Sequence, residues 1–410
     1  MKTLPNYYNN SKSKSRETKK LVVIPAYCSS LGGMTVSLAL LIKGFELCGA
    51  SDQLCLLVRA GSTLEKYLKN AGQESVIKSI PRQGKQMLLP QALQWVAQQP
   101  QDWPLLLDNC VAVSYLPFLL KAVPQLRLSH RPVYHFCHDL ALSHNPLGYL
   151  ARKVTFTCLA PAAICNSQFT ANHIHKLIPD IRGILYQPVD TEQFNNQPPT
   201  GSPPKNLQPI LNSGARIMLT PSRLNQPGIV NDKNLRALIP VLAQLKAKGH
   251  FYHGVIIGED KSPGQIHTRT LLESAEKLGV ADRFTILPPT FAIEDYYKYA
   301  DVVVSLAPRE PFGRTVVEAV ACGVPVVGSN TGGINEILQN FAPEWTVEPN
   351  NPMAVAEAII KVINSTTTSD TLSKGKDWVD TYCSVAGYAQ RIIQITGLAL
   401  ANSSLDLNRV

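Results

Sequence analysis

Two glutamates stand eight positions apart in the run APREPFGRTVVEAVACGVPVVG of the second half of the chain. Glu310 follows the apolar stretch DVVVSLA, which has the pattern of a buried strand. A Pro-Phe-Gly turn comes next, and a helical pattern begins near Arg314 and places Glu318 about one turn inside. Unpaired N–H groups at such a helix start form an anion site that suits a diphosphate. The two carboxylates can then accept hydrogen bonds from sugar and ribose hydroxyls.

The alternative interpretation of this pair is structural. Glu310 would be an ordinary loop residue, and the helix dipole would favour Glu318 in a first turn. The surrounding strand, turn, helix and second strand favour the functional interpretation.

Two cations stand upstream of this run. Arg223 and Lys233 fall in the run LTPSRLNQPGIVNDKNLRALI, after another strand candidate. The alternative for Lys233 is a solvated residue near the start of a helix.

The first half of the chain offers weaker signals. Gly32-Gly33 follows the strand candidate LVVIPAY, but it is not the Gly-x-Gly-x-x-Gly of nicotinamide-binding folds. His138 ends the strand candidate VYHFCH, where a neutral imidazole can hydrogen-bond to a sugar hydroxyl or orient an acceptor. A purely structural histidine is the alternative at that position.

Three residues near His138 are of types that bind metal ions, so a metal site is an alternative at this position. His135, Cys137 and His144 lie close to it in the sequence. Strand alternation places residues 135 and 137 on one face and residue 138 on the other, which prevents a shared centre. The sequence also contains no Asp-x-Asp, a motif that holds a divalent ion in metal-dependent sugar transferases. We therefore expect no metal.

Short β-branched runs alternate with helical patterns along the chain, which predicts parallel sheets covered by helices. The pattern lapses over residues 197–213, QPPTGSPPKNLQPILNS, a composition typical of a linker. A chain of 410 residues also favours two domains. We predict two Rossmann-like α/β domains facing across a cleft, with ligands at the carboxyl ends of the strands. The predicted divisions are a disordered basic tail over 1–20, a first domain over 21–190 joined by about 381–400, a linker over 191–212, and a second domain over 213–380.

The positive charge lies in the first half. Residues 1–190 hold 20 Lys and Arg against 10 Asp and Glu, whereas residues 191–410 hold 19 against 20. Either this is a solvated basic surface with a basic tail, or the first domain meets an acidic membrane face or an anionic acceptor. The basic residues are dispersed and no base-stacking motif accompanies them, so we expect no nucleic acid. Nine cysteines, an odd count without Cys-x-x-Cys, favour a reducing cytosol.

The run around Glu310 and Glu318 resembles the E-x7-E signature of retaining GT-B glycosyltransferases of family 4, and the similarity extends from about residue 21 to residue 400. GGINEI resembles the next element of that family and contains Glu336. The resemblance implies that Glu310 contacts the donor sugar and Glu318 the donor ribose. It also implies the cation pair Arg223 and Lys233, which at the mouth of a cleft would neutralise a diphosphate and stabilise the charge that it gains on leaving. The family places its lysine closer to the arginine than the ten residues found here.

The resemblance extends to the first domain and to the end of the chain. It implies a histidine near the reacting sugar, here His138, and a backbone contact at Gly33. The stretch KDWVDTYCSVAGYAQRIIQITG is similar to the terminal helix of the family, which crosses back onto the first domain. The implied catalytic group is Glu310, His138, Arg223 and Lys233. The implied donor-binding set is Gly33, Arg223, Lys233, Glu310, Phe312, Gly313, Arg314, Thr315 and Glu318.

The implied activity is metal-independent, retaining transfer of a hexosyl group from a nucleotide-diphosphate sugar to an acceptor hydroxyl. The acceptor would be a glycan, a lipid-linked molecule or a small molecule, in polysaccharide or glycolipid biosynthesis. No cofactor is expected. The cysteine usage predicts a cytoplasmic location, and the charge of the first domain allows peripheral contact with the inner membrane face.

Other functions remain open. A glycosidase also uses two carboxylates, but on opposite sides of the bond rather than beside a phosphate-binding helix start. A nucleotide-sugar epimerase shares the predicted architecture. The wide Arg–Lys gap and Gln187-Pro188, where the family often has Asn-Gly, leave open a catalytically silent sugar-nucleotide sensor or partner subunit, although the presence of Glu310, Glu318 and Arg223 together favours an enzyme.

Overall fold

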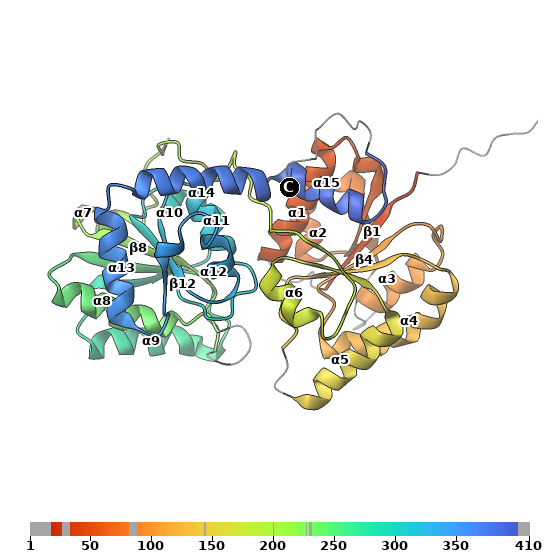
Figure 1. Cartoon of the computed structure of the whole chain (residues 1–410), viewed down its shortest axis with the longest axis horizontal. Helices are drawn as coiled ribbons and strands as arrows, with labels where there is room; N and C mark the ends of the chain where they lie inside the picture. The colour runs from red at the N-terminus through yellow and green to blue at the C-terminus, as the bar shows by residue number, and fades with distance from the viewer. Residues whose placement is uncertain are drawn as a thin grey trace, which may run out of the picture.

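The computed structural model describes residues 18–26, 33–81, 88–142, 145–199, 201–226, 228 and 232–400. Two α/β units lie side by side, and a long helix runs along one edge from the second toward the first (Figure 1). Most of the predicted basic tail lies outside the described residues. None of the described helices is long and apolar enough to cross a membrane.

The first domain is built on a parallel sheet of seven strands in the order β3-β2-β1-β4-β5-β6-β7. Its central strands are almost continuously apolar because helices cover both faces. All residues of β1, for example, are buried. The strands are β1 (Leu21–Pro25), β2 (Leu54–Arg59), β3 (Ile77–Ile80), β4 (Leu105–Asp108), β5 (Val133–Cys137), β6 (Ala162–Cys165) and β7 (Ile181–Ile184).

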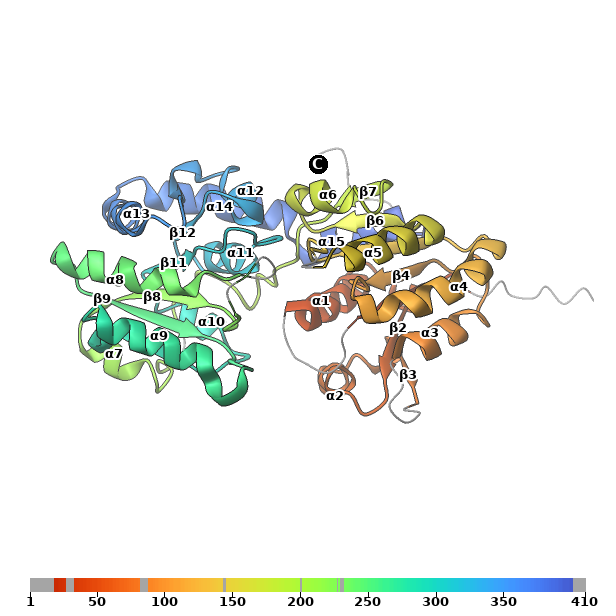
Figure 2. The ribbon, with the colours of Figure 1, turned by 90° about the horizontal axis from the view of Figure 1, so that it is seen from below.

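The helices of this domain form two layers around the sheet. One layer shares a core with α3, α4, α5 and α6, and the other with α1, α2 and α15. Figure 2 shows α3, α4 and α5 on one side of the sheet. The helices are α1 (Gly33–Leu47), α2 (Thr63–Asn70), α3 (Leu88–Val96), α4 (Leu116–Leu128), α5 (Pro146–Leu159) and α6 (Gln168–Ile174).

The second domain repeats the architecture with a parallel sheet of six strands in the order β10-β9-β8-β11-β12-β13. The strands are β8 (Arg216–Pro221), β9 (Tyr252–Ile257), β10 (Phe284–Leu287), β11 (Val302–Ser305), β12 (Val326–Ser329) and β13 (Thr346–Val347). The helices are α7 (Gln208–Asn212), α8 (Leu238–Ala247), α9 (Ile266–Lys277), α10 (Glu294–Tyr297), α11 (Arg314–Ala321), α12 (Gly332–Leu338) and α13 (Pro352–Asn364). Two parallel-sheet α/β domains were predicted, and the structure confirms them.

The segment between the sheets is partly packed. Its last residues form α7, and Leu207 and Ile210 are buried in the core of the second domain. The start of this segment is therefore irregular, as the proline-rich composition predicts, whereas its end is a packed helix.

The end of the chain returns to the first domain as predicted, but as two helices rather than one. Helix α14 (Thr368–Tyr382) runs along the second domain and α15 (Val385–Ile395) packs against α1. The helix is interrupted between them because Ser384 caps α15. The Ser384 Oγ accepts a hydrogen bond from the Gly387 N–H at 3.3 Å. Helices α1 and α15 approach closely at Gly44, where a Cβ would lie 2.6 Å from the Val385 carbonyl oxygen.

Candidate functional site

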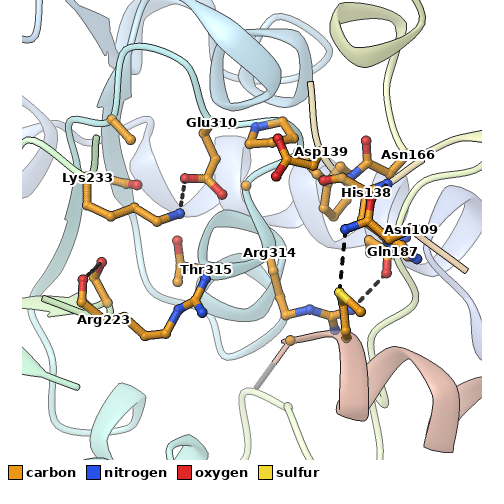
Figure 3. A pocket seen from close by; sticks show the side chains of 18 of the residues that line it. Asn109, His138, Asp139, Asn166, Gln187, Arg223, Lys233, Glu310, Arg314 and Thr315 are labelled. Atoms are coloured by element: carbon orange, nitrogen blue, oxygen red, sulfur yellow. Dashed lines mark hydrogen bonds and ion pairs between the residues drawn. The ribbon is translucent and has the colours of Figure 1, made fainter. Parts of the chain in front are cut away.

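A cavity of about 760 Å³ lies between the two domains and is lined by residues of both. Its walls come from the carboxyl ends of strands in the two sheets, where parallel α/β folds bind ligands. Figure 3 shows side chains from the two domains pointing into this space. All but one of the predicted site residues line it, namely Gly33, His138, Arg223, Lys233, Glu310, Phe312, Gly313, Arg314 and Thr315. The exception is Glu318.

The loop after β11, residues 306–313, forms much of the cavity wall on the side of the second domain, called here the second-domain wall. Gly313 adopts φ +108°, a left-handed conformation that lets the chain turn into α11 at Arg314, where the sequence predicted the helix to begin. Helix α12 supports the loop from behind, because the Gly333 N–H donates to the Glu310 carbonyl oxygen at 2.8 Å. A Cβ at Gly333 would lie 2.4 Å from the Phe312 carbonyl oxygen, so no larger residue fits there.

Lys233 and Glu310 form an ion pair in this wall, with 2.5 Å between Lys233 Nζ and Glu310 Oε2. Their side chains are 23% and 19% exposed, which leaves both open to the cavity. Arg223 points toward the same space (Figure 3). The structure thus brings together the two cations and the glutamate that the sequence singled out, despite the ten-residue gap between the cations.

Glu318 lies deeper. Its residue is 7% exposed, and its Oε2 accepts a hydrogen bond from the Tyr297 hydroxyl at 3.0 Å. Burial raises the pKa of the carboxyl to about 7, although the charge of Arg314 and the Tyr297 hydrogen bond act in the opposite direction. Because Glu318 does not line the described cavity, its predicted contact with a ribose remains a prediction.

The first-domain wall centres on His138, which follows β5. Its Nε2 lies 2.6 Å from Oδ1 of Asp108, the last residue of β4. Its backbone N–H donates to Asn109 Oδ1 and its carbonyl oxygen accepts from Asn166 Nδ2, both at 3.2 Å. Asp108 and His138 are only 5% and 9% exposed in their side chains. The Asp108 carboxylate therefore orients the imidazole, and the two asparagine side chains fix the backbone of His138.

Sequence analysis missed the polar partners of His138. Asp108 and Asn109 end the run PLLLDN, and Asn166 follows the strand candidate AAICNS. The available signal was a polar residue at the carboxyl end of each apolar strand, which the rule for parallel sheets marks as a cleft position.

His135 and His138 lie on opposite faces of β5, as strand alternation predicted. His135 is fully buried beside Phe156, and its Nδ1 lies 3.1 Å from Cys137 Sγ. Burial lowers the pKa of His135 to about 4, so the ring is neutral at physiological pH. Among the described residues, no group of three or more His, Cys, Asp or Glu is arranged to hold a metal ion. His144 lies outside the described residues.

Arg314 connects the two walls. Its Nη2 donates to Ser37 Oγ at 2.6 Å and to Gln187 Oε1 at 3.1 Å, and its Nη1 donates to the Pro188 carbonyl oxygen at 3.1 Å. Ser37 belongs to α1, whose first residue, Gly33, lines the cavity beside Arg314. Gly32 lies outside the described residues. Arg314, predicted as a donor-binding residue, therefore also bridges the domains.

A second bridge lies beside the loop after β11. Both carboxylate oxygens of Glu336 accept backbone hydrogen bonds at 2.8 Å, from the N–H groups of Gln168 and Phe169 at the start of α6. Tyr186 Oη donates to Glu336 Oε1 at 3.1 Å. The hydroxyl of Ser167 donates to the carbonyl oxygen of Pro311, next to Glu310. The position of this loop is thus tied to the position of the first domain.

Residues 210–377 match the model of a protein family described as glycosyl transferases group 1. The second domain is therefore similar to this family, and the matched region is called here the group 1 domain. The group 1 domain holds the loop after β11, Lys233 and Arg223, whereas His138 and its partners lie outside the matched region.

Curated relatives match parts of the chain. A D-inositol 3-phosphate glycosyltransferase of Segniliparus rotundus is 25% identical over 56% of this chain and 54% of its own length. Another, from Rhodococcus opacus, is 34% identical over 28% of this chain and 26% of its own length. An N-acetyl-alpha-D-glucosaminyl L-malate synthase of Bacillus anthracis is 30% identical over 23% of this chain and 25% of its own. The chain thus spans about half or less of the relatives it matches.

Solved structures share the whole fold. HepE from Anabaena, crystallised with UDP and glucose, has a TM-score of 0.73 at 19% identity, covering 92% of this chain and 99% of its own. Sucrose-phosphate synthase from Thermosynechococcus elongatus has a TM-score of 0.66 at 16% identity, covering 92% of this chain and 98% of its own. The two-domain arrangement around the group 1 domain is therefore the GT-B fold that the resemblance implied.

Proposed function

We propose that this protein is a retaining, metal-independent glycosyltransferase that moves a hexosyl group from a nucleotide-diphosphate sugar to an acceptor hydroxyl. The observation that carries the proposal is the convergence of Arg223, Lys233 and Glu310 at the start of α11, inside a cavity that both domains line. Relatives of the group 1 domain that are named as glycosyltransferases support the same reaction class, as does a GT-B neighbour crystallised with UDP-glucose.

In this mechanism the group 1 domain holds the donor. The amide groups of residues 313–316 and the side chains of Arg223 and Lys233 bind the diphosphate, and Glu310 accepts hydrogen bonds from sugar hydroxyls. The C1–O bond to the diphosphate breaks, and its electron pair leaves with the phosphate oxygen. The acceptor oxygen forms a new bond to C1 on the same face, and its proton passes to the departing diphosphate.

The first domain orients the acceptor. His138 accepts a hydrogen bond from a sugar or acceptor hydroxyl, while Asp108 holds its Nε2. With cationic side chains and helix amides around the diphosphate, the reaction needs no divalent ion. Reaction in the cytoplasm fits a nucleotide-sugar substrate and the unpaired cysteines of the described part of the chain.

The test is a nucleotide-release assay with UDP-, GDP- and ADP-sugars, with and without EDTA. We expect one donor to be turned over equally in both conditions, and we expect Glu310→Gln and Arg223→Ala to slow release about a hundredfold or more. Glu259→Gln, an exposed carboxylate of the same domain, is the matched control and should keep the wild-type rate.

Two other results would redirect the proposal. Donor binding without release, detected as a raised melting temperature, would favour the sensor alternative. Activity lost in EDTA and restored by a divalent ion would contradict metal independence. The anomeric configuration of the product, determined by NMR, tests retention.

A further inference from the structure

Exposed apolar side chains gather on two neighbouring helices of the first domain. Helix α5 exposes Leu147, Leu150 and Val154 by 71%, 55% and 47%, and α4 exposes Leu120 and Leu128 by 37% and 81%. The two helices pack against each other and belong to the same layer over the sheet (Figure 2). Their outer sides therefore form one surface, called here the α4–α5 face.

The spacing on α5 shows that this exposure is organised. Residues 147, 150 and 154 follow each other at intervals of three and four, so they form one stripe along the helix. The side chains that α5 packs into the domain, such as Phe156 and Leu159, lie on the opposite side. Helix α5 thus has two apolar sides, and only one of them is covered within the described chain.

The charge around this stripe has a single sign. From Asn109 to Pro179 the sequence contains six Lys and Arg residues and one acidic residue, Asp139, which lines the cavity. Lys121, Arg127 and Lys153 are exposed on α4 and α5. None of the ion pairs between described residues involves these three cations, so no carboxylate offsets them.

We propose that the α4–α5 face docks on an anionic lipid surface. A leucine-rich stripe flanked by unpaired lysine and arginine is the pattern with which an amphipathic helix lies in the headgroup region of a bilayer. The cations then meet the negative surface potential while the leucines enter the acyl boundary. A second copy of the chain fits poorly, because pairing two such faces would bring cations together without carboxylates between them.

Helix α5 belongs both to the α4–α5 face and to the wall of the cavity. Leu142, which lines the cavity, lies a few residues before α5 begins at Pro146, and Arg152 of α5 also lines the cavity. Arg152 lies on the side of α5 opposite to the exposed stripe, so docking would place α5 between the lipid and the first-domain wall. If the proposed sugar transfer is correct, the acceptor is then a lipid-linked molecule; the docking itself does not depend on that activity.

The experiment is a flotation assay of the full chain with vesicles of phosphatidylcholine alone and with about a third phosphatidylglycerol. We expect binding to the anionic vesicles, at least about tenfold weaker to phosphatidylcholine, and weakened by high salt. The triple variant Leu147→Gln, Leu150→Gln, Val154→Gln and the triple variant Lys121→Gln, Arg127→Gln, Lys153→Gln should each reduce binding about tenfold or more.

Matched controls come from the second domain. Leu272→Gln with Leu278→Gln changes exposed leucines, and Lys277→Gln with Lys361→Gln and Lys374→Gln removes exposed lysines. These variants should bind like the wild type. All variants should keep the wild-type circular dichroism spectrum and the wild-type rate of nucleotide release from a soluble donor, which separates loss of docking from loss of fold or activity.

Three results would overturn the proposal. One is absence of binding to anionic vesicles, and another is equal loss of binding in the control variants. The third is concentration-dependent dimerisation in analytical ultracentrifugation that the α4–α5 variants abolish, which would assign the face to a second copy.

Discussion

The two walls of the cavity hold their polar groups in different ways. The second-domain wall presents charges, with the Lys233–Glu310 ion pair and Arg223 facing the cavity. The first-domain wall presents a side chain held from behind, because Asp108 and His138 are almost fully buried and the side chains of Asn109 and Asn166 bind the His138 backbone. One wall is suited to bind a charged group strongly, and the other is suited to orient a neutral hydroxyl.

The difference indicates that the two walls have different roles in the proposed reaction, one in binding the donor and the other in fixing geometry. Because the ion pair is open to the cavity, Lys233 can turn from Glu310 to a diphosphate when it enters, and Glu310 is then free to accept hydrogen bonds from the donor sugar. A buried hydrogen bond such as that between Asp108 and His138 stays in place and fixes geometry instead. Substitutions in the second-domain wall should therefore change rates more than substitutions behind the first-domain wall.

The largest effect is expected for Lys233→Met. It removes the cation nearest Glu310 and leaves that carboxylate without its partner at 2.5 Å. We expect nucleotide release to fall about a hundredfold or more, because a preorganised charge in such a site is worth several kcal/mol. Steady-state kinetics with the donor that the nucleotide-release assay selects measures this loss.

Lys261→Met is the matched control for Lys233. Lys261 also lines the cavity, but its side chain is 60% exposed and pairs with Glu259 at 3.1 Å. We expect less than about a threefold change there, because solvent screens an exposed charge. Equal losses in both variants would mean that the summed charge of the wall matters and the position of Lys233 does not.

A smaller effect is expected for Asp108→Asn. The amide can still bond to His138, but without a charge, and it no longer selects one tautomer of the ring. We expect the turnover number to fall about tenfold, since a charge-assisted hydrogen bond is worth about 1.5 kcal/mol or more, with little change in donor KM.

A double-mutant cycle with His138→Gln tests whether Asp108 acts through the histidine. If it does, Asp108→Asn costs little in the His138→Gln background. If the two losses multiply, Asp108 contributes by another route, such as the stability of the β4 end, and its role as a positioning residue is wrong.

The contrast between the walls also explains what the sequence could predict. Glu310, Arg314 and the start of α11 were predicted because one contiguous run carries a strand, a glycine turn and a helix. Lys233 was predicted as a partner of the same site and lies in its wall. The two parallel sheets followed from apolar runs alternating with helical patterns.

The first-domain wall could not be predicted in the same detail. Asp108 and Asn166 are each a single polar residue after an apolar strand, which is common at any strand end. Only the sheet order β4-β5-β6 places them on either side of His138. The bridges have the same origin, since Arg314 meets Gln187 and Glu336 meets α6 across more than a hundred positions of sequence. Contacts of that range depend on how the two domains pack.

The smallest effect on rate, and a distinct effect on stability, is expected for Glu318→Gln behind the second-domain wall. The pKa of Glu318 is raised from 4.5 to about 7 in the folded chain. Between these values the folded state keeps a proton that the unfolded state has lost, so stability decreases as the pH rises through this window. The full cost above pH 7 is roughly 3 kcal/mol at about 1.4 kcal/mol per pKa unit.

Glutamine keeps the shape and can still accept the hydrogen bond of Tyr297 without carrying a charge. We therefore expect wild type and Glu318→Gln to unfold alike near pH 4.5, and the variant to be more stable by roughly 2–3 kcal/mol at pH 8 in urea denaturation. A constant difference across this range would mean that Glu318 is ionised in the folded chain. At pH 8, adding the donor nucleotide then tests the predicted ribose contact: if it raises the melting temperature of both proteins equally, Glu318 is a buried support of the wall and not a ligand of the ribose.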